Sequence, residues 1–119
     1  MFVIKDIQLE AFRKREVAKF VEKSKLFLQQ NFEKWCQKKD DDALKIFIQR
    51  TIESGADVNI RKQNNVQKLL FLQIEYQLNF PLKGEYEKIM LERNVSEDQR
   101  ITSLHKTLDR LRKRNELSG

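Results

Sequence analysis

The sequence predicts an all-α protein, a compact five- or six-helix orthogonal bundle with a central, buried fourth helix. Only three of the 119 residues are Gly and one is Pro, whereas sheet proteins need frequent turn residues. Apolar residues instead recur at intervals of three and four, which places them on one face of a helix. Hydrophobic residues make up 39% of the chain, including eight Phe, enough apolar surface to fold. One domain over residues 1–119 is expected, because domains run to about 100–150 residues.

Three helices are expected in the first half of the chain, over residues 5–12, 15–35 and 42–55. The apolar stripe of the second consists of Val17, Phe20, Val21, Phe27, Leu28, Phe32 and Trp35. Asp40–Asp42 precede the third helix, where carboxylates accept bonds from free backbone N–H groups and offset the helix dipole. Gly55 is expected to cap the third helix at its C-terminal end.

A fourth helix is expected over residues 62–78, and its run Leu69–Leu72 is apolar on nearly every side. A helix of that kind is buried, which makes it the centre of the domain. Pro81 ends it, because proline disfavours helical geometry in the residue before it.

Two more helices follow, over residues 85–93 and 97–115, and Ser96 with Gln99 forms a capping-box pattern at the start of the last one. The last helix has a narrow apolar seam of Ile101, Leu104, Leu108 and Leu111. Residues 100–114 also contain six basic groups and one acid, so this segment holds +5 of the chain's net charge of +6.

The composition favours a cytoplasmic protein. Cys36 is the only cysteine, so no disulfide can form within the chain. The apolar run at residues 1–4 is too short for a signal peptide. No stretch approaches the 18 or so apolar residues that a membrane-spanning helix needs.

No catalytic, metal or cofactor site is predicted, and the chain is not expected to be an enzyme. Asp40–Asp42 could suggest a cation site, but consecutive residues point in different directions and no calcium-loop pattern follows, so capping is favoured. Cys36 and the single histidine, His105, are too few for a zinc site. A Cys–His nucleophile pair would need an activating environment, and the residues around Cys36 do not resemble one.

The basic last helix raises nucleic-acid binding as an alternative, because cations on one helix can follow a phosphate backbone. Its candidate residues are Arg110, Arg112, Lys113 and Arg114. The segment Arg61–Asn65 is a faint version of a recognition-helix start. The competing interpretation is a surface helix whose cations complement the negative end of its own dipole.

Several core and cap positions together resemble a family of small bacterial proteins encoded in type VI secretion gene neighbourhoods. These positions are FVIKDIQLEAF after Met1, Phe27-Leu28, Phe32, Cys36, Ala43-Leu44, Ile48, Ile52, Ile60, Val66, Asn79-Phe80 and Leu108–Leu111. The chain departs from the family at Glu33, where the family tends to have Pro, and at Asp40, where it tends to have Gly. The resemblance implies no enzyme activity and an accessory role in handling a secreted effector.

The sequence therefore favours a non-catalytic protein-binding accessory protein, a chaperone or adaptor for a type VI effector or spike component. An immunity protein that neutralises a cognate toxin is the alternative, and a basic nucleic-acid-binding regulator is the third. Candidate contact residues are Phe2, Trp35, Phe80 and Leu82, together with the four basic residues of the last helix. Apolar anchors with basic residues at the rim are typical of a protein interface. Core packing is the competing interpretation for the four apolar residues.

Overall fold

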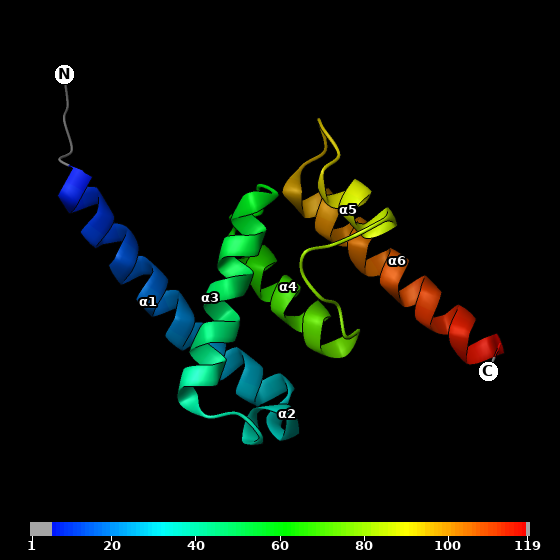
Figure 1. Ribbon diagram of the computed structural model, residues 1–119, viewed down its shortest axis with the longest axis horizontal. Coiled ribbons are helices and arrows are strands. Elements are labelled where there is room, and N and C mark those ends of the chain that lie inside the picture. The colour runs from blue at the N-terminus through cyan, green and yellow to red at the C-terminus, as the bar shows by residue number, and fades with distance from the viewer. Residues whose placement is uncertain (1–5, 119) are drawn as a thin grey trace. The chain divides into compact units, whose positions relative to one another are not determined.

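The computed structural model describes the backbone of residues 6–118 and the side chains of residues 13–115. This part of the chain is all-α, as predicted, and it contains no strand. Its helices are α1 (Asp6–Asn31), α2 (Glu33–Gln37), α3 (Asp41–Asp57), α4 (Gln63–Glu75), α5 (Glu85–Met90) and α6 (Glu97–Ser118) (Figure 1). The chain divides into two units, residues 1–49 and residues 50–119, and the division falls within α3. The single domain stays a prediction, and each unit is described by itself.

The first two predicted helices are one helix, so the division at residues 13–14 was wrong. α1 runs without interruption from Asp6 to Asn31, because Arg13 and Lys14 favour a helix and neither Gly nor Pro interrupts it. The predicted end at Trp35 was also wrong. The chain leaves the helix at Phe32 (φ −139°, ψ 56°), and Trp35 belongs to the short helix α2.

The first unit buries part of the predicted stripe of α1, whereas Val17 of that stripe is exposed. Phe20, Val21 and Leu28 are buried there, as are Leu44 and Ile48 of α3. At the start of α3, the Asp40 carboxylate accepts a bond of 2.7 Å from the backbone N–H of Ala43, which confirms the capping role.

Asp41, the next acid, forms ion pairs instead. Its carboxylate lies 2.5 Å from the Lys25 ammonium and 3.2 Å from that of Lys45. Hydrogen bonds from Lys25 and then Lys45 lower the pKa of Asp41. The acidic cluster therefore caps α3 and ties it to α1.

Gly55 does not cap α3, which corrects the sequence-based expectation. The helix continues to Asp57, and Asn59 takes the left-handed conformation (φ 59°). Gly55 instead allows a close approach, since a Cβ there would lie 3.0 Å from the Ile60 carbonyl oxygen and 3.4 Å from Leu69. This glycine lets the chain turn back against α4.

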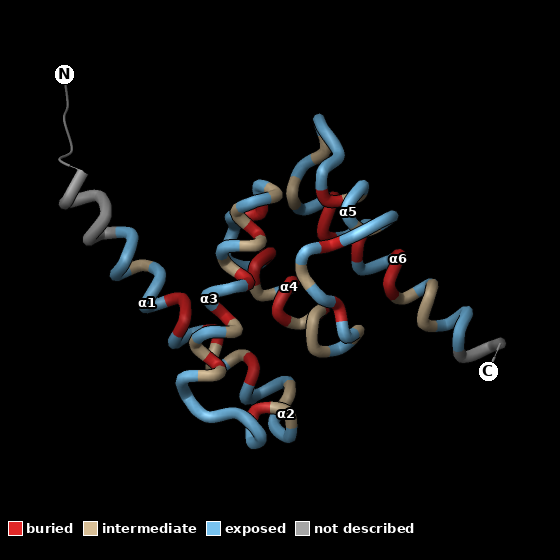
Figure 2. The backbone as a smooth tube through the Cα atoms, in the orientation of Figure 1, coloured by how far each residue is buried: buried red, intermediate tan, exposed pale blue. Residues whose placement is uncertain are grey.

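The second unit has its core between α4, α5 and α6. Buried residues recur along α4 as far as Leu72 and along α6 as far as Leu108 (Figure 2). They are Asn65, Val66, Leu69, Leu70 and Leu72 on α4, with Arg100, Ile101, Leu104, Thr107 and Leu108 on α6. The buried fourth helix was thus predicted correctly, although α4 ends at Glu75 rather than at residue 78. The seam of the last helix was predicted correctly up to Leu108, whereas Leu111 is half-buried.

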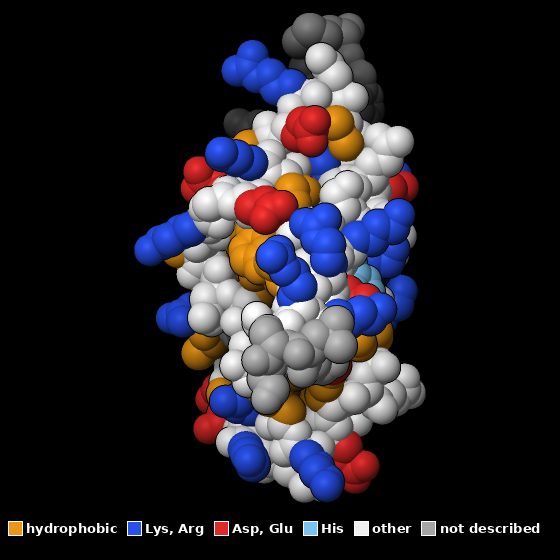
Figure 3. Space-filling model, turned by 90° about the vertical axis from the view of Figure 1, so that its right-hand side faces the viewer, with side chains coloured by type: hydrophobic (Ala, Val, Ile, Leu, Met, Phe, Trp, Pro, Cys, Tyr) orange, Lys and Arg blue, Asp and Glu red, His pale blue; other side chains and the backbone are white. Residues whose placement is uncertain are grey.

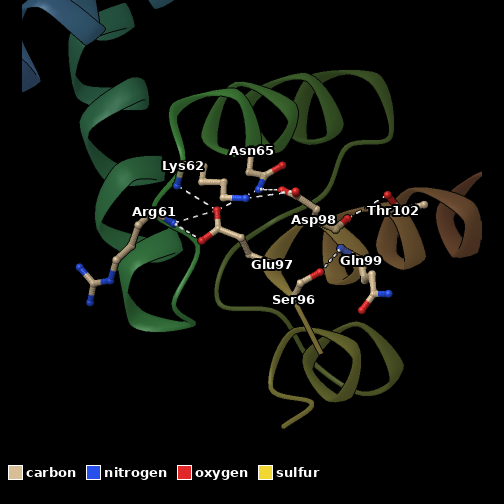
Figure 4. A network of polar contacts seen from close by, with 8 residues as sticks. All are labelled: Arg61, Lys62, Asn65, Ser96, Glu97, Asp98, Gln99 and Thr102. Atoms are coloured by element: carbon tan, nitrogen blue, oxygen red, sulfur yellow. Dashed lines mark hydrogen bonds and ion pairs between the residues drawn. The ribbon is translucent and has the colours of Figure 1, made fainter. Parts of the chain in front are cut away.

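A polar network joins the starts of α4 and α6 (Figure 4). The Glu97 carboxylate accepts bonds from the backbone N–H groups of Arg61 and Lys62 and from the Asn65 amide, the last at 2.8 Å. Asn65 also donates to Asp98 at 2.7 Å. Burial opposes ionisation of Glu97, but these bonds outweigh it and lower its pKa. Asn65 is fully buried, whereas the other four residues of the segment Arg61–Asn65 are exposed.

None of the helices within the described residues is long and apolar enough to cross a membrane.

Candidate partner-binding groove

An open groove of about 340 Å³ lies on the second unit where the end of α3, the α4–α5 connector and α5 meet. We name it the Leu91 groove. Its lining consists of Ser54, Asp57, Val58, Phe80, Pro81, Leu82, Glu87, Met90 and Leu91. Two of the predicted partner-binding residues, Phe80 and Leu82, therefore belong to one surface feature.

The connector places one apolar residue inside the core and the next ones at the surface. Leu82 is 7% exposed, so the packing interpretation was right for this residue and its side chain fixes the connector. Phe80 is half-buried and Pro81 is exposed. Gly84 then begins α5 with φ 62° and ψ −131°, a conformation that only glycine adopts readily. Phe80 and Pro81 thus form an apolar edge of the groove, and the buried side chain of Leu82 holds their connector in place.

Arg100 of α6 fixes two walls of the groove. Its guanidinium Nη1 donates to the Val58 carbonyl at 2.6 Å and to the Met90 carbonyl at 2.7 Å, and Nη2 donates to Asn59 at 3.2 Å. Val58 and Met90 both line the groove. A planar fork of donors can bind several carbonyls at once, so Arg100 sets the position of the α3 end relative to α5.

Arg100 was counted with the surface charge of the last helix, and this was wrong because the residue is 8% exposed. A signal for burial was present. Arg100 lies four and eight residues before Leu104 and Leu108, so it shares their side of the helix. What the sequence could not show is that carbonyl groups, rather than a carboxylate, receive the guanidinium.

Leu91 is a large exposed apolar residue of the groove. It is 56% exposed and follows the fully buried Met90. Among the described side chains it belongs to a small set of large exposed apolar residues, the others being Val17, Leu26 and Ile46. Single exposed apolar residues are common, but Leu91 lines the same groove as Phe80 and Pro81, and apolar residues gathered at one surface site are typical of an interaction site.

The charge of the groove is opposite to that of the chain. Asp57 and Glu87 are among the lining residues, which include no Lys or Arg, although the chain has a net charge of +6. An apolar groove with two carboxylates in its lining is complementary to a segment that carries apolar side chains beside Lys or Arg.

The remaining apolar candidates do not reach this groove. Phe2 lies outside the described residues. Trp35, in the first unit, is half-buried, with its ring 5.1 Å from that of Phe47 and the Lys39 ammonium 5.2 Å from the ring centre. Packing thus accounts for Trp35.

The basic candidates lie on α6 and are not part of the groove. Arg110 lies 3.4 Å from Glu85, and Lys113 lies 3.0 Å from Asp109. Arg112 lies 2.9 Å from Glu75 and stacks 3.9 Å from the Tyr76 ring centre. Arg114 is exposed. Much of the predicted positive surface is therefore compensated by neighbouring carboxylates.

Cys36 and His105 each have a structural role: Cys36 is buried, and His105 contacts the Tyr76 side chain. Cys36 is buried in the first unit, and burial raises the pKa of its thiol, which opposes a nucleophilic role. In the second unit, His105 Nε2 lies 3.2 Å from the Tyr76 hydroxyl. Within the described residues there is no group of three or more His, Cys, Asp or Glu side chains placed to bind a metal.

Comparison of the chain with protein-family models, with curated proteins and with solved structures gives no significant match.

Proposed function

We propose that this chain is a non-catalytic accessory protein that binds another protein through the Leu91 groove. The observation that supports the proposal most is the exposed Leu91 beside Phe80 and Pro81, within a groove whose lining carries two carboxylates and no cation. The partner contributes a segment with one or two apolar side chains flanked by basic residues.

The groove is the centre of the interface and not its whole extent. A volume of about 340 Å³ accommodates one or two side chains, whereas a stable interface buries roughly 800 Å² on each partner. Burying one large aliphatic side chain contributes about 1.5–3 kcal/mol. Removing the apolar contact at Leu91 should therefore weaken binding by at least about tenfold.

The resemblance to type VI accessory proteins suggests the class of partner. It favours a secreted effector or a spike component, and hence a chaperone or adaptor role. This part of the proposal depends on the sequence resemblance alone.

Co-expression with the products of neighbouring genes, followed by purification of any stable complex, tests the proposal. Leu91→Glu should abolish co-purification, because it places a charge, which would have to lose its hydration, where the apolar contact forms. Leu26→Glu is the matched control, since Leu26 is also exposed (61%) but lies on α1. The control should retain the partner.

Two results would contradict the proposal. One is that no neighbouring product co-purifies with the wild-type chain or gains solubility from it. The other is that Leu91→Glu retains its partner as well as Leu26→Glu does. Protection of cells from the toxicity of a neighbouring product, without an effect on its delivery, would replace the chaperone role with the immunity role.

A further inference from the structure

A second surface depression lies beside the Leu91 groove. Two hollows of about 500 and 480 Å³ are formed by the C-terminal end of α4, the α4–α5 connector, α5 and α6. They share four lining residues, Tyr76, Gln77, Tyr86 and Leu108, so they form one continuous depression. We name it the tyrosine groove.

The tyrosine groove and the Leu91 groove meet at the α4–α5 connector. Phe80, Pro81 and Leu82 line both of them. Leu82 is buried, whereas Phe80 and Pro81 reach the surface, so the apolar edge formed by these two residues is the boundary between the grooves. A segment that fills the Leu91 groove and continues over this edge enters the tyrosine groove.

The size of the Leu91 groove requires such a continuation. At about 340 Å³ it holds one or two side chains of a partner, whereas a stable interface covers roughly 800 Å² on each protein. The partner must therefore contact further surface of this chain. The tyrosine groove is concave, larger than the Leu91 groove and directly adjacent to it, so it provides that surface.

Tyr86 of α5 has the properties of an anchor residue. Its side chain is half-buried in the tyrosine groove, and its hydroxyl group has no hydrogen-bond partner among the described residues. A buried tyrosine hydroxyl usually has a partner, and tyrosine is common among the residues that contribute most to binding. Tyr76 differs, because its hydroxyl donates to Asp109 and Arg112 stacks on its ring.

The two grooves differ in charge. Asp57 and Glu87 line the Leu91 groove, whereas Glu75 is the only carboxylate among the described residues that line the tyrosine groove, and it pairs with Arg112 at 2.9 Å. Figure 3 shows Lys and Arg side chains spread over the side of the chain where α6 ends, with apolar side chains between them. The basic residues of a partner are therefore favoured at the Leu91 groove, and an uncharged stretch is favoured at the tyrosine groove.

Exposed amide side chains indicate the conformation of the partner. Gln77, Asn79 and Asn115 line the tyrosine groove, and their side-chain amides form no hydrogen bond with another described residue. Each amide group can donate and accept. An extended peptide has unpaired backbone N–H and C=O groups that such amides can bind, whereas a helix pairs these groups within itself. The lining thus favours an extended segment.

We propose that the Leu91 groove and the tyrosine groove together bind one extended peptide segment of the partner. Its basic and apolar part lies in the Leu91 groove, and its uncharged part crosses the Phe80–Pro81 edge and packs an apolar side chain against Tyr86. This inference rests on the proposed function, because it takes the Leu91 groove as one end of the interface. It adds the second contact region and the kind of segment that is recognised.

Peptides selected from a phage-displayed random library test the proposal. The library presents peptides of about 16 residues, which span about 50 Å when extended, to the full wild-type chain, and fluorescence anisotropy measures the affinity of each selected peptide. Selected peptides should combine an apolar residue beside Lys or Arg in one half with uncharged residues in the other half. Tyr86→Ala and Leu91→Glu should each weaken their binding by at least about fivefold.

Further variants separate direct contact from altered packing. Ile89→Ala is the matched control, because Ile89 is also half-buried on α5 but lines neither groove. Its affinity should stay within roughly twofold of wild type. Tyr86→Phe keeps the ring and removes the hydroxyl, so it should weaken binding by about two- to tenfold. A peptide shortened to its basic half should bind Tyr86→Ala and wild type equally well, because it no longer reaches the tyrosine groove.

Four outcomes would overturn the inference. If Leu91→Glu abolishes binding but Tyr86→Ala binds as tightly as wild type, the tyrosine groove is not part of the interface, and the proposed function stands. If Tyr86→Ala and Ile89→Ala weaken binding equally, the effect comes from the packing of α5. If no selected peptide binds saturably, the chain does not recognise an extended segment. If Leu91→Glu leaves the affinity unchanged, the Leu91 groove is not a binding site, and the proposed function fails together with the inference.

Discussion

Replacing Arg100 with methionine tests how the second unit is held together. Arg100→Met keeps a flexible apolar stem but removes the guanidinium bonds to the carbonyls of Val58, Asn59 and Met90. Hydrogen bonds to charged groups contribute about 1.5–3 kcal/mol each, and a carbonyl left buried without a partner costs about 1–3 kcal/mol. Removing a buried charge also recovers a desolvation penalty of several kcal/mol. We expect a net loss of about 2–3 kcal/mol in the free energy of unfolding.

The measurement is urea unfolding followed by far-UV circular dichroism. With a denaturant slope of roughly 1.5 kcal/mol/M, the midpoint should fall by about 1.5 M. Arg93→Met is the matched control, because Arg93 is exposed between α5 and α6, and it should change stability by less than about 0.5 kcal/mol. Arg100→Lys should also destabilise, since one ammonium cannot reproduce the planar fork. If Arg100→Met unfolds at the same urea concentration as Arg93→Met, the argument for Arg100 is refuted.

Three further predictions use other contacts. Glu97→Gln should lower the free energy of unfolding at neutral pH by about 1–2 kcal/mol. Because folding lowers the pKa of Glu97, the difference from wild type should shrink as the pH falls below 4.5, the pKa of this group without such contacts. A difference in urea midpoint that stays constant with pH would contradict this. Gly55→Ala should destabilise by about 1 kcal/mol in thermal unfolding despite the better helix propensity of alanine, because its Cβ meets the Ile60 carbonyl at 3.0 Å; a rise in melting temperature would contradict it. Asp57→Asn/Glu87→Gln should weaken binding of a basic partner and reduce the dependence of its affinity on salt. If the partner binds this variant as tightly as the wild-type chain, the two carboxylates do not contribute to recognition.

The helices of this chain could be predicted where local pattern alone decides them. Leu69, Leu70 and Leu72 of the apolar run, and the seam from Ile101 to Leu108, are buried as their spacing indicated, whereas Phe71 within the run is half-buried. The C-terminal boundary of the third helix was predicted wrongly because the contacts that decide it lie further along the chain. Gly55 had the composition of a cap, but it lies within α3 because the chain returns against it at Ile60 and Leu69.

The candidate groove could be predicted only in part, for the same reason. Phe80 and Leu82 were singled out because they are apolar and lie in a connector, yet that criterion could not separate the buried Leu82 from the accessible Phe80. Leu91 was missed because it follows a helix whose apolar side ends at Met90, and nothing local shows that it shares a groove with Phe80 and Pro81.

The missing information is the position of α5 relative to the end of α3. Arg100 supplies it through carbonyl groups at Val58 and Met90, and every residue has a carbonyl group, so no side-chain pattern records the contact. If the Leu91 groove binds a partner, Arg100 therefore shapes the groove without having to contact that partner. Loss of binding in Arg100→Met with Leu91 unchanged would distinguish this positioning role from direct contact.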